Sequence, residues 1–80
     1  MYGWYKLIKE NDHEMKIGYS VEKNKSCDGL LNYNKHTDEF VTEKYSDGAD
    51  DWITKWLSSH ILAKIIMGKI SETPRMIAVG

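Results

Sequence analysis

The sequence is poor in cysteine, proline and arginine, with one of each among its 80 residues: Cys27, Pro74 and Arg75. A single cysteine excludes an intrachain disulfide and is typical of a reducing compartment, so we expect a cytoplasmic protein. Arginine makes the bidentate contacts by which proteins recognise phosphate and guanine. Its scarcity, together with a formal net charge of −1, argues against a nucleic-acid partner.

The chain also lacks a long hydrophobic run. Its most apolar stretch, HILAKIIMG at residues 60–68, is too short to cross a bilayer and contains Lys64. The N-terminal residues show no basic region followed by an apolar segment, as a signal peptide would. We therefore expect neither a membrane partner nor a secreted protein.

What is present is typical of a small globular protein. Apolar residues make up 41% of the chain and charged residues 29%, and the three tryptophans and five tyrosines argue against disorder. Eighty residues suffice for one domain with a modest core. We predict a single domain over residues 1–80.

Four segments have the patterns of β-strands, and short polar links join them. Residues 14–23 alternate apolar and polar side chains with a period of two. Asparagine and aspartate in the link before them favour a turn, so residues 2–10 and 14–23 form a hairpin. Residues 27–34 and 39–46 form a second hairpin, in which Tyr33 and Phe40 are placed to pair. The sequence predicts an antiparallel meander.

From Trp52 the apolar spacing becomes helical, which predicts a helix over about residues 50–68 with Asp50 as its N-cap. A stripe expected to face the sheet lies within about 60° of arc on this helix: Trp52, Trp56, Ala63, Met67 and Ile70. A short last strand at residues 75–80 is expected beside the first. The predicted fold is α+β: a mostly antiparallel sheet of four to five strands, in the order ββββαβ, with one long helix across one face.

Catalytic and metal-binding patterns are weak. Cys27 needs a nearby base, and of the three histidines only His60, on the helix, could approach it through the fold. His13 and His36 lie in separate turns, and no C-x-x-C or H-x-x-x-H spacing is present. We therefore predict an inert, buried Cys27, no catalytic residue, no metal, no cofactor, and a protein that is not an enzyme.

Acidic residues and glycines give no stronger signal. The carboxylates of residues 47–51 lack the alternating ligands of a calcium loop and are explained by helix capping. The glycines are isolated and form no phosphate-binding loop.

Two apolar surfaces remain without a predicted cover. Trp4 lies on the face of the first strand that the helix does not cover. Ile61, Leu62 and Ile65 lie off the predicted helix stripe, and we expect them to be exposed in a monomer unless the last strand or the preceding loop covers them. We predict these four residues as the interaction surface of a non-catalytic module, which forms a homodimer or binds a larger protein.

Two other functions stay open. A small enzyme or enzyme subunit would use His60 in a cleft. A binder of single-stranded nucleic acid would use aromatic groups on the sheet with nearby lysines, although glutamates on the same strands cancel that charge.

Overall fold

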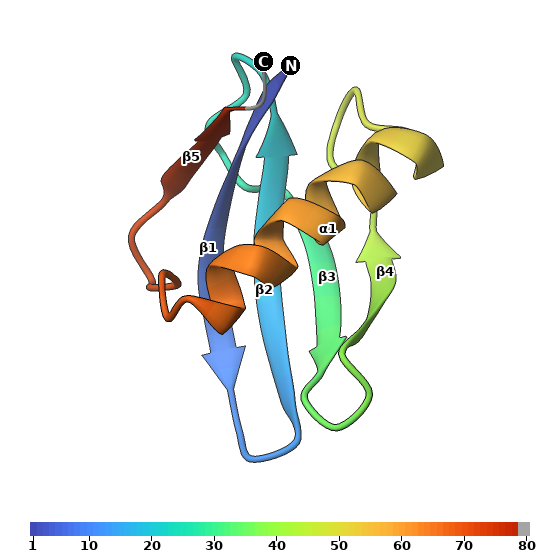
Figure 1. Ribbon diagram of the computed structural model, residues 1–80. Helices are drawn as coiled ribbons and strands as arrows, with labels where there is room; N and C mark the ends of the chain where they lie inside the picture. Colours follow the sequence, from blue (N-terminus) through green and yellow to red (C-terminus); the bar gives the residue numbers. More distant parts are fainter. Residues whose placement is uncertain (79–80) are drawn as a thin grey trace.

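The computed structural model describes residues 1–78 and confirms the predicted α+β fold (Figure 1). One antiparallel sheet has the strand order β4-β3-β2-β1-β5, and one helix follows the fourth strand. The last strand pairs with the first, as predicted, and positions 79 and 80 of the predicted last strand lie outside the described residues. The elements are β1 (Tyr2–Glu10), β2 (Glu14–Val21), β3 (Gly29–Asn34), β4 (Glu39–Lys44), α1 (Asp51–Ile66) and β5 (Arg75–Ala78).

Both hairpin turns are held by an asparagine side chain. The Oδ1 atom of Asn11 accepts hydrogen bonds from the backbone N–H groups of His13 and Glu14, at 2.8 and 2.9 Å. In the β3–β4 turn, Oδ1 of Asn34 accepts from the N–H of His36 at 2.8 Å. Such side-chain bonds replace backbone partners and fix the turn geometry.

Helix α1 begins and ends as its sequence predicts. The carboxylate of Asp50 accepts a hydrogen bond from the N–H of Ile53 at 2.8 Å, which makes Asp50 the N-cap. After the last turn, Gly68 adopts a φ of +72°, a conformation that glycine reaches without strain. The helix crosses the sheet obliquely (Figure 1).

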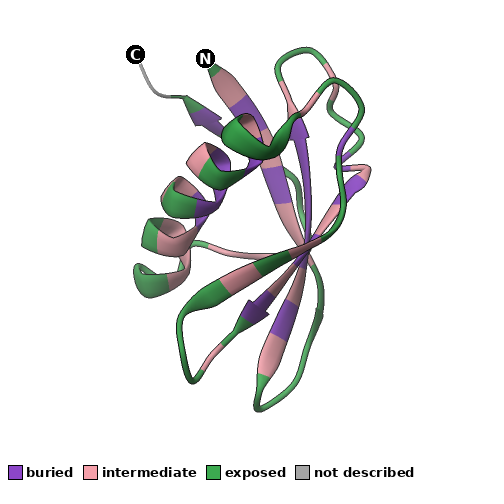
Figure 2. Cartoon of the chain, turned by 90° about the vertical axis from the view of Figure 1, so that its right-hand side faces the viewer, coloured by how far each residue is buried: buried purple, intermediate pink, exposed green. Residues whose placement is uncertain are grey.

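The predicted face of α1 was wrong for Trp52, Ala63 and Met67, which are exposed, whereas Trp56 and Ile70 of the same predicted stripe are partly buried against the core. The buried side chains are Thr54, Leu57, Ser58 and Ile61, whereas Trp52 is 67% exposed. Figure 2 shows buried positions on the side of the helix that faces the sheet and exposed positions on the opposite side. The inner face contains two hydroxyls, which a count of apolar residues does not assign to a core.

Both hydroxyls are satisfied where they lie. Oγ1 of Thr54 is 2.7 Å from the hydroxyl of Tyr19 on β2, and Oγ of Ser58 donates to the carbonyl of Thr54 at 2.8 Å. Hydrogen bonding removes most of the cost of burying a hydroxyl. Polar residues can therefore occupy the centre of this helix–sheet contact.

The segment between β2 and β3, residues 22–28, covers part of the sheet face turned away from α1; we call it the rear loop. The indole N–H of Trp4 donates to the carbonyl of Glu22 at 2.8 Å, and the N–H of Cys27 donates to Oγ of Ser20 at 3.1 Å. A Cβ atom at Gly18 would lie only 2.9 Å from the Cys27 carbonyl oxygen. The rear loop therefore packs directly on β2. It is the cover of the sheet face turned away from α1 near Trp4.

Candidate functional site

The outer face of α1 is an exposed apolar surface, which we call the outer stripe. It comprises three strongly exposed side chains, Trp52 at 67%, Ile66 at 74% and Met67 at 58%, with exposed Ala63 and half-buried Trp56 between them. Trp52 and Met67 are about 22 Å apart along the helix axis at 1.5 Å per residue. These residues include most of the stripe that was predicted to face the sheet.

The two ends of the outer stripe carry opposite charges. Asp50 and Asp51 lie at the N-terminus of α1, and Lys64 and Lys69 lie in or after its last turn. Asp51 forms an ion pair with Lys55 at 3.1 Å, and the hydrogen bond from Lys55 is the main cause that lowers the pKa of Asp51. The helix is thus acidic at one end and basic at the other.

The predicted interaction residues do not form one surface. Ile61 is 0% exposed and lies in the core, and Leu62 and Ile65 are partly buried against that core. These three residues therefore lie in or against the core of their own chain, and their expected exposure is corrected. Trp4 lies on the opposite side of the sheet, half-buried beneath the rear loop with Lys25 Nζ 5.3 Å from its ring centroid.

The structure does not bring His60 and Cys27 together. His60 lies on α1, where its ring meets the edge of Trp56 with ring centroids 4.7 Å apart. Cys27 lies in the rear loop, on the other side of the sheet. The Cys27 side chain is buried, and this burial raises the pKa of its thiol.

The two hairpin turns bring His13 and His36 into contact at one end of the sheet. Nδ1 of His13 lies 2.9 Å from Nε2 of His36, and the ring centroids are 5.2 Å apart. Sequence reasoning missed this pair. The signal was available, because in an antiparallel meander the first and third turns lie at the same end of the sheet.

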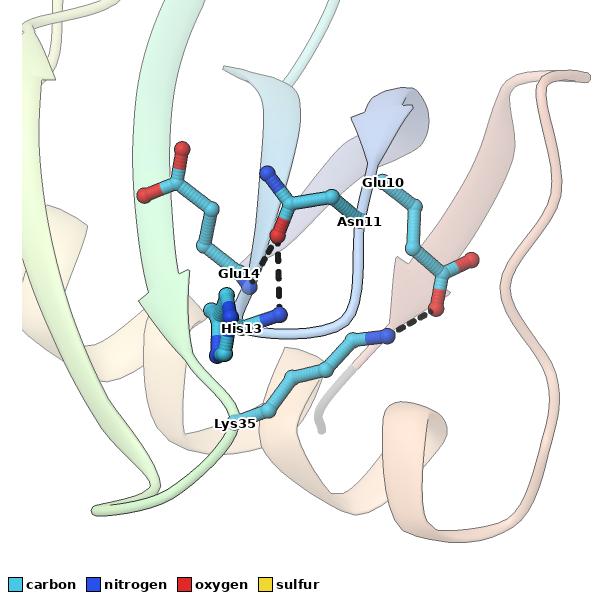
Figure 3. Close-up of polar contacts among 5 residues, drawn as sticks. All are labelled: Glu10, Asn11, His13, Glu14 and Lys35. Atoms are coloured by element: carbon cyan, nitrogen blue, oxygen red, sulfur yellow. Dashed lines mark hydrogen bonds and ion pairs between the residues drawn. The ribbon is translucent and has the colours of Figure 1, made fainter.

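Backbone and ionic contacts hold the same two turns together. The backbone N–H of Lys35 donates to the carbonyl of His13 at 2.9 Å. Figure 3 shows the side chain of Lys35 reaching from the β3–β4 turn to Glu10 at the end of β1. Nζ of Lys35 and Oε2 of Glu10 are 2.6 Å apart. Figure 3 also shows Asn11 holding its own turn.

Beside His13, on the sheet face turned away from α1, lies a cavity of about 330 Å³. It is lined by His13, Glu14, Asn32, Asn34, Thr37, Glu39 and Val41. The Nδ2 group of Asn32 donates to Glu14 at 3.0 Å, and Oδ1 of Asn32 is buried without a hydrogen-bond partner. The cavity is therefore rich in oxygen acceptors.

Comparison with known proteins found no matching family model, and no curated protein or solved structure with significant similarity. Over residues 1–78, no helix combines the length and apolar character that a bilayer span requires.

Proposed function

We propose that the protein is a non-catalytic interaction module that forms a homodimer through the outer stripe of α1. The observation that carries this proposal is the exposure of Trp52, Ile66 and Met67 on one face of one helix. Large apolar side chains exposed on one face are typical of contact surfaces, and here exposed Lys55 and Ser59 lie among them. Burying each large apolar side chain is worth about 1.5–3 kcal/mol.

Charge complementarity selects a second copy as the occupant. A two-fold axis perpendicular to the outer stripe makes the two helices antiparallel. Each contact between two residues across the interface then occurs twice, once on each side of the axis. The acidic end of one helix, at Asp50 and Asp51, then lies beside the basic end of the other, at Lys64 and Lys69. The antiparallel arrangement also aligns the helix dipoles favourably.

The stripe is one helix wide, which limits the strength of the dimer. A standard stable interface buries roughly 800 Å² on each partner, more than three exposed side chains supply. Association also costs translational and rotational entropy. We therefore expect a reversible dimer whose population rises with protein concentration. The proposal includes a cytoplasmic location, supported by the single free cysteine, Cys27.

Sedimentation over a concentration series tests the proposal. Wild type should shift from monomer to dimer, and Ile66→Lys should remain a folded monomer because a charge enters the contact. Val41→Lys is the matched control, since Val41 is also a strongly exposed aliphatic residue, at 63%, and lies on β4. This control should dimerise like wild type.

Amide chemical shifts give a second measurement. On dilution, the shifts that change should cluster on the outer face of α1. A wild-type protein that stays monomeric at millimolar concentration, or equal dimerisation of Ile66→Lys and wild type, would overturn the proposal.

A further inference from the structure

Two histidines distant in sequence present one imidazole nitrogen each to the same point. Nδ1 of His13 and Nε2 of His36 are 2.9 Å apart, and both side chains are exposed. Asn11 and Asn34 fix the backbone of their two turns. The N–H of Lys35, in the β3–β4 turn, donates to the carbonyl of His13 in the β1–β2 turn. The pair is thus held in place by contacts that do not involve the imidazole rings.

We infer that His13 and His36 form a binding site for a divalent transition-metal ion, with Nδ1 of His13 and Nε2 of His36 as its protein ligands. Imidazole nitrogen is a preferred ligand of nickel, copper and zinc. Two nitrogens bound about 2.05 Å from one ion at a right angle are about 2.9 Å apart. The observed separation has this value, so binding requires the rings to turn but not to move apart.

The protons balance without any co-reactant. When both rings are neutral, one of them donates an N–H across the 2.9 Å contact and the other accepts it with its lone pair. Metal binding needs a lone pair from both nitrogens. The donating ring therefore moves its proton to its other nitrogen through solvent, and no net proton is released.

The rest of the coordination sphere is open. In the described part of the chain, no group of three or more His, Cys, Asp or Glu side chains is placed to hold a metal ion. Water fills the remaining positions. Glu14 and Glu39, in the cavity next to His13, add negative charge that favours a cation.

The right-angle geometry favours nickel and copper over zinc. A tetrahedral ion places two nitrogens about 3.3 Å apart, so zinc would need the rings to separate slightly. Nickel(II) is the better probe of the two, because copper(II) can oxidise a thiol. The bound ion would link the two hairpins, and since it binds the folded chain it should raise the melting temperature.

Calorimetric titration with Ni²⁺ tests the site on the full chain. Wild type should bind one equivalent, and His13→Ala and His36→Ala should each bind at least about tenfold more weakly, because one of two ligands is lost. His60→Ala is the matched control, since it removes the third histidine of the chain from α1. This control should bind Ni²⁺ like wild type. Ni²⁺ should raise the melting temperature of wild type and of His60→Ala, but not that of His13→Ala or His36→Ala.

Imidazole ¹⁵N chemical shifts with Zn²⁺, which is diamagnetic, provide a test on the wild-type chain alone. The shifts that move should be those of the His13 and His36 imidazoles, with Nδ1 of His13 and Nε2 of His36 taking the shift of a metal-bound nitrogen. Shifts confined to His60, equal Ni²⁺ affinity in wild type and His13→Ala, or no saturation by about 1 mM would overturn the site.

Discussion

The hydroxyl oxygens of Tyr19 and Thr54 lie 2.7 Å apart in the interior between β2 and α1. The N–H of Ser46, in the loop that leads into the helix, donates to the same Tyr19 oxygen at 3.1 Å. One phenol thus connects the sheet, the helix and the loop between them. Because all three residues are buried, water cannot replace a lost partner.

Removing the Tyr19 hydroxyl should therefore destabilise the fold. We expect Tyr19→Phe to lower the free energy of unfolding by about 1–3 kcal/mol, because two buried groups lose their partner. Urea denaturation measures the change. Tyr45→Phe removes an exposed hydroxyl bonded to Asp51 at 3.0 Å and should cost much less, because water can replace the lost partner.

A double-mutant cycle with Thr54→Val separates this contact from its surroundings. The combined loss should be smaller than the sum of the single losses, because both variants break the same hydrogen bond. Additive losses would show that Tyr19 and Thr54 do not interact.

Gly29 has no room for a side chain. A Cβ atom there would lie 2.3 Å from Cε1 of Tyr19 and 2.7 Å from the backbone nitrogen of Ser46. We expect Gly29→Ala to cost about 1–3 kcal/mol or more, because a buried ring must move. Thermal unfolding should show a larger loss than for Gly48→Ala, whose φ is +82° but whose Cβ would meet nothing within 4 Å. A loss at Gly29 well below about 1 kcal/mol would contradict this packing.

We expect the protein to lose stability in alkaline solution, where the contact between Tyr33 and Asp38 is lost. The hydroxyl of Tyr33 donates to the carboxylate of Asp38, and this bond, with burial as a smaller cause, raises the pKa of Tyr33 to about 12. A folded pKa above the unfolded value of about 10 means that the stabilisation is complete below pH 10. It is lost as the pH rises through 12.

The pH dependence of urea midpoints checks this expectation. Tyr33→Phe should be less stable than wild type at pH 7, and the difference should narrow between about pH 10 and pH 12. A difference that stays constant through pH 12 would mean that the Asp38 contact does not form.

Cys27 should react slowly with thiol reagents at neutral pH. The side chain is 6% exposed, and burial raises the pKa of the thiol, which lowers the thiolate fraction. Reaction therefore requires the rear loop to open. Trp4→Phe removes the indole bond to Glu22 and should accelerate labelling, whereas Trp52→Phe, at an exposed position, should not. Labelling as fast as in denaturant would show that the loop does not protect the thiol.

Local patterns were sufficient to predict the elements and their order. The period of two, the Asp50 cap and the pairing of Tyr33 with Phe40 all depend on neighbours in sequence or across one turn, and all three are present. The structure also confirms the expected placement of the last strand beside the first, which no local pattern determines.

The helix face could not be read from apolar spacing, because α1 carries large apolar groups on both sides. The choice between Trp52 and Leu57 as the inward residue depends on contacts with β1, where a Cβ at Gly3 would lie 2.7 Å from Cδ2 of Leu57. It also depends on the Tyr19 hydroxyl, which gives Thr54 a buried partner. Such contacts arise only once the sheet has formed.

The candidate sites were harder to predict for a related reason. His13 and His36 have no ligand spacing in the sequence, and they meet because the predicted meander places their two turns at the same end of the sheet.

The pairing of β5 with β1 has a consequence for how the chain folds during synthesis. The strands β1 to β4 follow one another in both sequence and space, whereas β1 completes its second edge only with residues 75–78. A ribosome that synthesises the chain from its N-terminus delivers four strands and the helix before β5 emerges. Until then β1 offers an unpaired row of backbone groups beside Trp4 and Tyr5, to which another nascent chain could add.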